Sequence, residues 1–152
     1  MNILSLFDGI SCAYLALQKA NITIDNYYAY EIDKFALQVS KTRFPQIQHF
    51  GNVEGVDFLI HKDIDLLIGG PSCQDLSIAK QNRLGLKGER SKVFWEFVRA
   101  LKEVKPRYFL MENVASMSKE DKAVITEALG VEPIMINSAL LGRVPTKIRD
   151  IS

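Results

Sequence analysis

Apolar and polar residues alternate along this chain in a pattern that predicts strands and helices in turn. Short apolar runs bounded by Gly, Pro, Asp or Asn are typical of buried strands, and they predict strands over Asn2–Phe7, Asp25–Glu31, Ile47–Phe50, Asp65–Ile68, Tyr108–Met111 and Pro133–Ile136. Apolar residues at helical spacing predict helices over Ser11–Ala20, Asp33–Arg43, Val93–Val104 and Lys119–Leu129. This order implies an α/β domain with a mostly parallel sheet of about six strands and helices on both faces.

The helical segments also predict caps and apolar faces. We expect Asp33 to cap the second helix and Gly130 to close the last one. The apolar positions of the helices are Tyr14, Leu15, Leu17, Phe35, Ala36, Leu37, Val39, Phe94, Phe97, Val98 and Leu101. We interpret Phe94 and Trp95 as core residues and not as a platform for stacking bases.

Composition narrows the class of protein. The chain has 152 residues, 47% of them hydrophobic, which suffices for one domain with a sizeable core. The net charge of +1 excludes a global attraction to nucleic acid or membrane. No apolar run approaches the roughly 18 residues of a membrane span, and the N-terminus lacks the basic region of a secretory signal. The two cysteines exclude a disulfide scaffold and a four-cysteine metal site, so we expect a cytoplasmic protein with reduced thiols and no metal.

Candidate chemistry gathers after the predicted strands. In open parallel sheets, ligands bind beyond the carboxyl ends of the strands. The segments at those ends are Phe7-Asp8-Gly9, Glu31, Gly51-Asn52, Gly69–Gln74 and Glu112-Asn113, with the last of these following the fifth strand. Five such strand ends exceed what a merely structural sheet requires, and they predict a ligand site.

The turn after the first strand and the acid that ends the second suit a nucleoside. Small residues let a cofactor approach the backbone, and Glu31 is placed to accept hydrogen bonds from a ribose diol. Only Gly9 of this turn is glycine, which disfavours a dinucleotide pyrophosphate site. The alternative is a tight structural turn with a capping glutamate.

Cys73 is a candidate nucleophile in a tight turn, and Glu112 ends a neighbouring predicted strand. A thiolate and an acid together can attack an electron-poor ring, although a lone cysteine is more often inert. A cysteine hydrolase would need a histidine, and we interpret His49 and His61 as solvated surface residues. The basic loop from Asp75 to Lys92 has two interpretations. It is either a segment that contacts a phosphate backbone or an ordinary solvated charged loop.

Six segments, in order and spacing, resemble successive motifs of the cytosine-5 DNA methyltransferase family. They are Leu6–Leu17, Tyr30–Asp33, Gly51–Val53, Gly69–Ser77, Arg90–Arg99 and Met111–Val114. The residues of these motifs are most similar to those of phage and bacterial members and of the animal de novo type. The resemblance implies a Rossmann-like methyltransferase fold, S-adenosylmethionine as methyl donor, S-adenosylhomocysteine as product and DNA as substrate.

The resemblance also implies roles for individual residues. The cofactor-binding residues would be Phe7, Asp8, Gly9, Ile10, Ser11, Cys12, Glu31, Ile32, Asn52 and Pro71. Among them, Phe7 would lie near the adenine, Glu31 on the ribose and Asn52 near the adenine amino group, where the family usually has Asp. Cys73 would attack C6 of a flipped cytosine and Glu112 would hold N3. The substrate-binding residues would be Gln74, Ser77, Asn113, Arg83 and Arg90.

The sequence departs from the family pattern in two places. Ser72 precedes the nucleophile where the family usually has Pro, and the tail 142–152, which has no clear period, lacks the family's Gln-x-Arg-x-Arg stretch. We therefore expect residues 1–141 to be an incomplete catalytic domain of a bacterial or phage-encoded modification enzyme, without its target-recognition domain. Such a chain would be weakly active or would require a second polypeptide. The alternatives are a catalytically dead cofactor- or nucleic-acid-binding module and a tRNA cytosine-5 methyltransferase.

Overall fold

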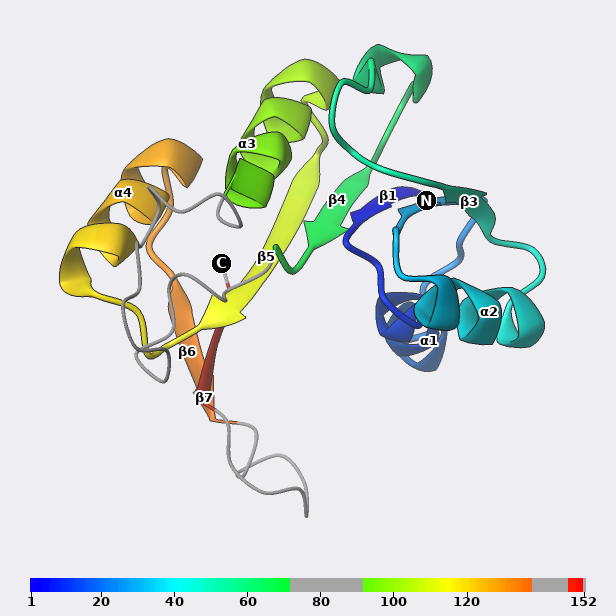
Figure 1. The fold of residues 1–152 in the computed structure, drawn as a ribbon, viewed down its shortest axis with the longest axis horizontal. Helices are drawn as coiled ribbons and strands as arrows, with labels where there is room; N and C mark the ends of the chain where they lie inside the picture. Colours follow the sequence, from blue (N-terminus) through cyan, green and yellow to red (C-terminus); the bar gives the residue numbers. More distant parts are fainter. Residues whose placement is uncertain (72–91, 138–147, 152) are drawn as a thin grey trace. The chain divides into compact units, whose positions relative to one another are not determined.

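The computed structural model describes residues 1–71, 92–137 and 148–151, the last four by their backbone alone (Figure 1). The chain divides into two compact units. The first unit comprises Met1–Gly70 and Arg99–Leu110, and the second comprises Pro71–Val98 and Met111–Ser152.

The first unit is built on a parallel sheet. Its strands are β1 (Asn2–Leu6), β2 (Asn26–Tyr30), β3 (Gln48–Phe50) and β4 (Leu66–Gly69), in the order β3-β2-β1-β4. All three pairings are parallel, and Ile3 is in register with both Tyr27 and Leu66. The central strand β1 is buried on both faces, as is typical of a parallel sheet covered by helices.

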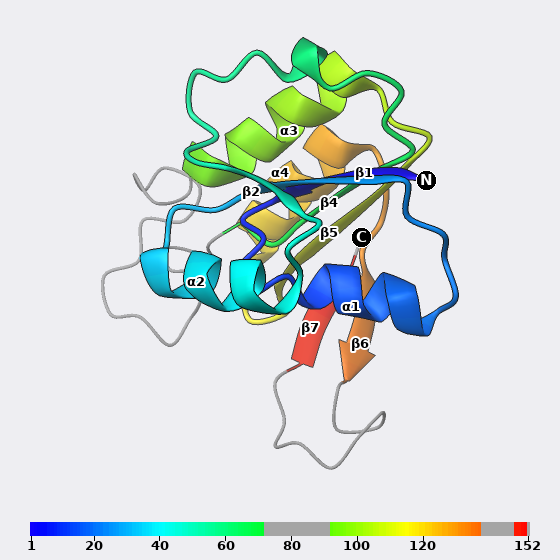
Figure 2. The same cartoon turned by 90° about the vertical axis from the view of Figure 1, so that its right-hand side faces the viewer.

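Helices cover one face of this sheet. Both α1 (Cys12–Lys19) and α2 (Lys34–Arg43) lie on the same side of β1 and β2 (Figure 2). Tyr14 of α1 meets the rings of Tyr27 and Phe44, each at 5.1 Å between centroids. The Asp33 side chain caps α2 by accepting a hydrogen bond from the Ala36 amide at 2.8 Å, as predicted.

The opposite face carries aromatic residues and the 3-10 helix η1 (Phe58–Ile60). Phe58 is fully buried and packs edge-on against Tyr30 of β2. The Arg99 guanidinium lies 4.5 Å from the Phe58 ring centroid and donates to the carbonyls of Val53 and Val56. Arg99 belongs to the part of α3 (Lys92–Val104) that lies in the first unit, so this helix fastens the loop after β3.

The second unit contains an antiparallel ladder. Its elements include β5 (Tyr108–Val114), α4 (Lys119–Leu129), β6 (Ile134–Asn137) and β7 (Ile148–Ile151). β7 lies between β5 and β6 and pairs with both in the antiparallel sense, with Ile151 opposite Glu112 and Ile134. Ser118 caps α4 at its start, and Gly130, at φ 72°, ends it as predicted.

The predicted α/β fold class is confirmed, and one expectation about the sheet is wrong. Residues 148–151, in the tail for which the sequence shows no clear period, form the additional strand β7. β7 also extends the ladder along β5, so Glu112 and Asn113 lie inside that strand and not after it. Within residues 1–71 and 92–137, no helix is long and apolar enough to cross a membrane.

Three expectations about side chains are also wrong. Phe35 is 81% exposed, because the buried side of α2 is the side that carries Ser40. The two residues are five positions apart, which places them about 140° from each other around the helix. Trp95 is 43% exposed, whereas its neighbour Phe94 is buried as expected. His61 is buried and not solvated, because the turn after η1 returns it to the aromatic face of β2.

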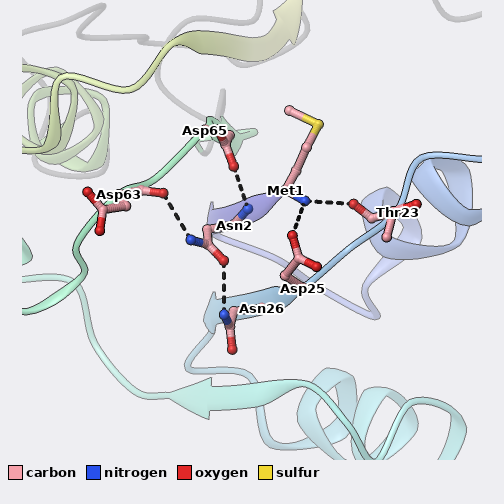
Figure 3. A network of polar contacts seen from close by, with 7 residues as sticks. All are labelled: Met1, Asn2, Thr23, Asp25, Asn26, Asp63 and Asp65. Atoms are coloured by element: carbon pink, nitrogen blue, oxygen red, sulfur yellow. Dashed lines mark hydrogen bonds and ion pairs between the residues drawn. The ribbon is translucent and has the colours of Figure 1, made fainter.

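At the amino ends of the strands, Asn2 joins three segments (Figure 3). Its side-chain amide donates to the Asp63 carbonyl at 3.1 Å and accepts from the Asn26 amide at 2.9 Å. We expect Asn2→Ala to lower the free energy of unfolding by about 1 kcal/mol, because both bonds are lost. Urea denaturation measures this, and Asn26→Ala, which loses one of the two bonds, is the matched control with a smaller effect. Equal stability of Asn2→Ala and the parent chain would contradict the prediction.

The buried His61 makes the stability of this unit depend on pH. Its Nε2 lies 2.8 Å from the Tyr30 hydroxyl, and burial lowers the pKa of the imidazole below its ordinary value. The unfolded chain therefore binds a proton at His61 more readily than the folded chain does. The free energy of unfolding is not reduced by this group above pH 6.5, and it falls as the pH drops from there toward the lower folded-state pKa. We expect a lower free energy of unfolding at pH 5.5 than at 7.5, and a flatter dependence in His61→Gln. An unchanged pH slope in that variant would refute the assignment to His61.

Candidate cofactor site and catalytic residues

The turn after β1 has an unusual backbone. Phe7, Gly9 and Ser11 all have positive φ, at 58°, 61° and 62°. Glycine adopts this conformation freely, whereas Phe7 and Ser11 require other interactions to hold them there. A Cβ added at Gly9 would meet no atom within 4 Å, so open space adjoins the turn at that point.

The Asp8 carboxylate stabilises the turn through hydrogen bonds to buried side chains. Oδ1 accepts hydrogen bonds from the Ser5 hydroxyl at 2.6 Å and the Tyr27 hydroxyl at 2.7 Å, and Oδ2 accepts one from Ser11. Burial, followed by the Asp8 charge, raises the pKa of Tyr27 far above its ordinary value. Tyr27 is therefore a permanent donor. The Asp8 amide also donates to the Tyr30 carbonyl at 3.1 Å, which ties the turn to β2.

The Glu31 carboxylate connects this turn to the start of α2. Its Oε2 accepts from the Gly9 amide at 2.7 Å, and its Oε1 accepts from the amides of Ile32 at 2.7 Å and Asp33 at 2.8 Å. A carboxylate offers about four acceptor positions, so Oε2 keeps one for a further donor. One side chain thus fixes both segments and retains the capacity to accept a ligand hydroxyl.

The other expected cofactor residues in this unit lie on the same edge. Ile10 follows Gly9 and is 41% exposed, and Ile32 follows Glu31 and is 70% exposed. Asn52 follows β3 and is exposed, and its Oδ1 accepts from the Glu54 amide at 3.1 Å. Cys12, which begins α1, is exposed. Exposed apolar side chains beside an acceptor carboxylate and an open turn fit a nucleoside, whose ring is apolar and whose ribose donates hydrogen bonds.

The expected catalytic residues are described in part. Pro71 is buried just after β4. Glu112 and Asn113 lie in β5, and Asn113 is buried with its Oδ1 accepting from the Val114 amide at 2.8 Å. The remaining residues, Cys73, Gln74, Ser77, Arg83 and Arg90, lie outside the described residues. Residues 1–71 and 92–137 contain no group of three His, Cys, Asp or Glu that would hold a metal ion.

Sequence reasoning missed the polar residues behind the turn. Ser5, Tyr27, Ser40 and His49 all belong to the hydrogen-bonded group around Asp8. Serines within apolar strands and helices are too common to signal this arrangement. His49 is half-buried, so its interpretation as a solvated residue is wrong as well.

The fold and this edge define an α/β domain with a site suited to a nucleoside cofactor. A family model for C-5 cytosine-specific DNA methylases matches residues 1–130. The chain therefore belongs to the C-5 cytosine-specific DNA methylase family, and the resemblance seen in the six motifs is confirmed.

Similar proteins come from phages and bacteria. The chain is 33% identical over 124 residues to orphan methyltransferase M.Rho11sI of Bacillus phage rho11s, covering 80% of this chain and 24% of that protein. It is 31% identical over 147 residues to orphan methyltransferase M.SPRI of Bacillus phage SPR, covering 93% and 33%. It is 34% identical over 120 residues to type II methyltransferase M1.ScrFI of Lactococcus lactis subsp. cremoris, covering 79% and 30%. The chain thus spans a quarter to a third of these relatives.

A solved structure shares the fold. The crystal structure of a protein assigned as a DNA modification methyltransferase, encoded within an Escherichia coli prophage, matches with a TM-score of 0.76. The match covers 99% of this chain and 46% of that one, at 24% sequence identity. At this identity the likeness shows the fold alone.

Proposed function

We propose that this chain is the catalytic part of a DNA cytosine-5 methyltransferase that uses S-adenosylmethionine. Family membership supports the reaction class. The observation that carries the cofactor assignment is the Glu31 carboxylate, which fixes Gly9 and the start of α2 and still has an acceptor position for a ribose hydroxyl.

The residues at this edge suit the cofactor in polarity. Glu31 would accept from the ribose, while the exposed side chains of Ile10 and Ile32 would contact the adenine ring together with Phe7. The Asn52 amide would face the adenine amino group. The remaining contacts of the proposed site in the first unit come from Asp8, Gly9, Ser11 and Cys12, whereas the role of Pro71 stays a prediction. When bound, S-adenosylmethionine supplies an electrophilic methyl group.

We assign the chemistry on the base to Cys73 and Glu112. The Cys73 thiolate would add to C6 of a flipped cytosine, which makes C5 nucleophilic, and Glu112 would hold N3 and favour that addition. Gln74, Ser77, Asn113, Arg83 and Arg90 would contact the DNA around the base. Ser72, in place of the family's Pro, would give the turn before Cys73 more freedom and slow the addition.

We propose that the contacts that read the DNA sequence come from outside the matched part, either from the same protein or from a second polypeptide. The relatives contain two thirds or more of their length beyond the matched part. Sequence is read by contacts to base edges, whereas phosphate contacts only position a protein. We therefore expect the 152-residue chain alone to methylate weakly and without marked sequence preference.

Transfer of tritium from labelled S-adenosylmethionine to a mixed-sequence DNA duplex, with tRNA in a parallel reaction, tests the function. Calorimetry with S-adenosylhomocysteine tests the cofactor. Binding together with transfer to DNA supports the proposal. Transfer to tRNA alone would make the chain an RNA methyltransferase, and binding of cofactor without transfer to either substrate would make it a binding module.

A further inference from the structure

We propose that Ser11, Ser40 and His49 are positioning residues, which hold the turn after β1 in its cofactor-binding shape through a hydrogen-bonded relay to Asp8. The inference rests on the proposed cofactor site and extends it to Ser40 and His49, which lie behind that site and reach it through Ser11. The relay runs from β3 through α2 to the turn, and all of its members lie in the first unit.

Every contact of the relay is short enough for a hydrogen bond, and the last is the longest. The Ser11 hydroxyl donates to Oδ2 of Asp8 and lies 2.5 Å from the Ser40 hydroxyl. The Ser40 hydroxyl lies 3.3 Å from Nε2 of His49. Ser11 and Ser40 are both fully buried, so water does not compete for the contact between their hydroxyl groups.

The direction of the relay follows from counting hydrogens. A carboxylate accepts only, so the single hydroxyl hydrogen of Ser11 goes to Asp8. Ser40 must then donate its hydrogen to Ser11, which leaves Ser40 able only to accept from His49. His49 therefore carries its proton on Nε2, and its buried Nδ1 is an acceptor that has no partner among the described residues.

The relay acts on the turn at Ser11. This residue has φ 62° and ψ 40° at the N-cap of α1, a left-handed conformation that disfavours residues with a Cβ. Its hydroxyl bonds to Asp8 and Ser40 compensate that strain and fix the segment between Asp8 and α1. That segment carries Gly9, whose amide donates a hydrogen bond to Glu31. The Ser40 hydroxyl therefore supports Glu31, the proposed ribose acceptor, through its contact with Ser11 and the bond from Gly9 to Glu31.

Three influences set the charge of His49. Burial, the largest, lowers the pKa of the imidazole, while the Asp8 charge raises it and the Lys41 charge lowers it. Protonation would place a second N–H at Nδ1, where the described residues offer no acceptor. A cationic His49 would therefore disturb the relay, and cofactor affinity should fall as the pH drops below the ordinary histidine range.

The first test needs no cofactor. Nitrogen-15 NMR of the 152-residue chain at pH 7.5 should show the Nε2–H tautomer of His49 and, in Ser40→Ala, a changed tautomer ratio. The matched control is Thr42→Ala, which removes an exposed hydroxyl from the same helix. A predominant Nδ1–H tautomer in the parent chain, or a Ser40→Ala spectrum identical to it, would overturn the relay.

The second test is calorimetry with S-adenosylhomocysteine at pH 7.5 and 5.5. We expect Ser40→Ala to bind about fivefold to tenfold more weakly at pH 7.5 and to lose the weakening at pH 5.5 that the parent chain shows. His49→Gln, whose amide also donates, should bind like the parent chain at pH 7.5, whereas His49→Leu should resemble Ser40→Ala. Equal binding by the parent chain and Ser40→Ala refutes the positioning role alone. No binding by the parent chain refutes the proposed cofactor site and the role together, even where NMR shows the relay.

Discussion

Replacing Cys73 with serine is expected to abolish covalent capture of a cytosine analogue by this protein. A thiol has an ordinary pKa of about 8.5, so a useful fraction is thiolate near neutral pH, whereas an alcohol remains protonated. After the sulfur adds to C6 and the methyl group is placed on C5, the hydrogen on C5 must leave before the sulfur departs. With fluorine at C5 this loss is blocked, and the protein stays attached to the DNA.

A denaturing gel with mixed-sequence duplexes that contain 5-fluorocytosine measures the adduct. We expect Cys73→Ser to reduce it by at least about a thousandfold. The matched control is Cys12→Ser, because Cys12 is an exposed thiol on the cofactor side of the chain. An adduct that persists in Cys73→Ser and disappears in Cys12→Ser would transfer the nucleophile to Cys12 and overturn the assignment.

The second large effect is expected at Glu31. Glu31→Ala removes the acceptor for three backbone amides, those of Gly9, Ile32 and Asp33, together with the proposed acceptor for the ribose. Hydrogen bonds to charged groups contribute about 1.5–3 kcal/mol each when protected from water, and less on this half-exposed side chain. We expect affinity for S-adenosylhomocysteine to fall about 100-fold and the free energy of unfolding to fall by about 1–2 kcal/mol.

Glu31→Gln separates the two contributions. Its single oxygen is able to serve either the Gly9 amide or the pair of amides at the start of α2, and its NH2 group then faces the remaining donor. Calorimetry and urea denaturation should place this variant between Glu31→Ala and the parent chain. Glu54→Ala, which removes an exposed carboxylate close to Asn52, should change neither quantity. Full affinity in Glu31→Ala would remove the ribose contact from the proposed site.

The elements of the first unit were predictable because their signals are local. Apolar runs bounded by turn residues located β1, β2 and β4 to within one or two residues, and the Asp33 cap follows from the chemistry of helix starts. The edge that carries Glu31 follows from the parallel topology, because it places the carboxyl ends of neighbouring strands together. The contacts of Glu31 with Gly9 were not predictable, since they join residues 22 positions apart.

Features that depend on contacts between residues far apart in the sequence were not predicted. Strand β7 is four residues long, and its own apolar pattern is too short to predict a strand. Its position depends on hydrogen-bonded ladders with β5 on one side and β6 on the other. The burial of His61 depends on its contacts with Tyr28 and Tyr30, about 30 positions earlier. The relay of Ser11, Ser40 and His49 likewise joins the turn before α1, helix α2 and strand β3, and no local signal marks its members.

The position of β7 between β5 and β6 also bears on the order of folding. β5 and β6 are close in sequence but do not pair, so neither completes its ladder in the second unit until residues 148–151 have been synthesised. The loop that closes between β5 and β7 spans more than 30 residues, and closing such loops is slow. The parallel strands β1, β2 and β3 all lie within the first 50 residues. Nascent chains should therefore protect the amides of β1 and β2 from hydrogen exchange well before those of β6.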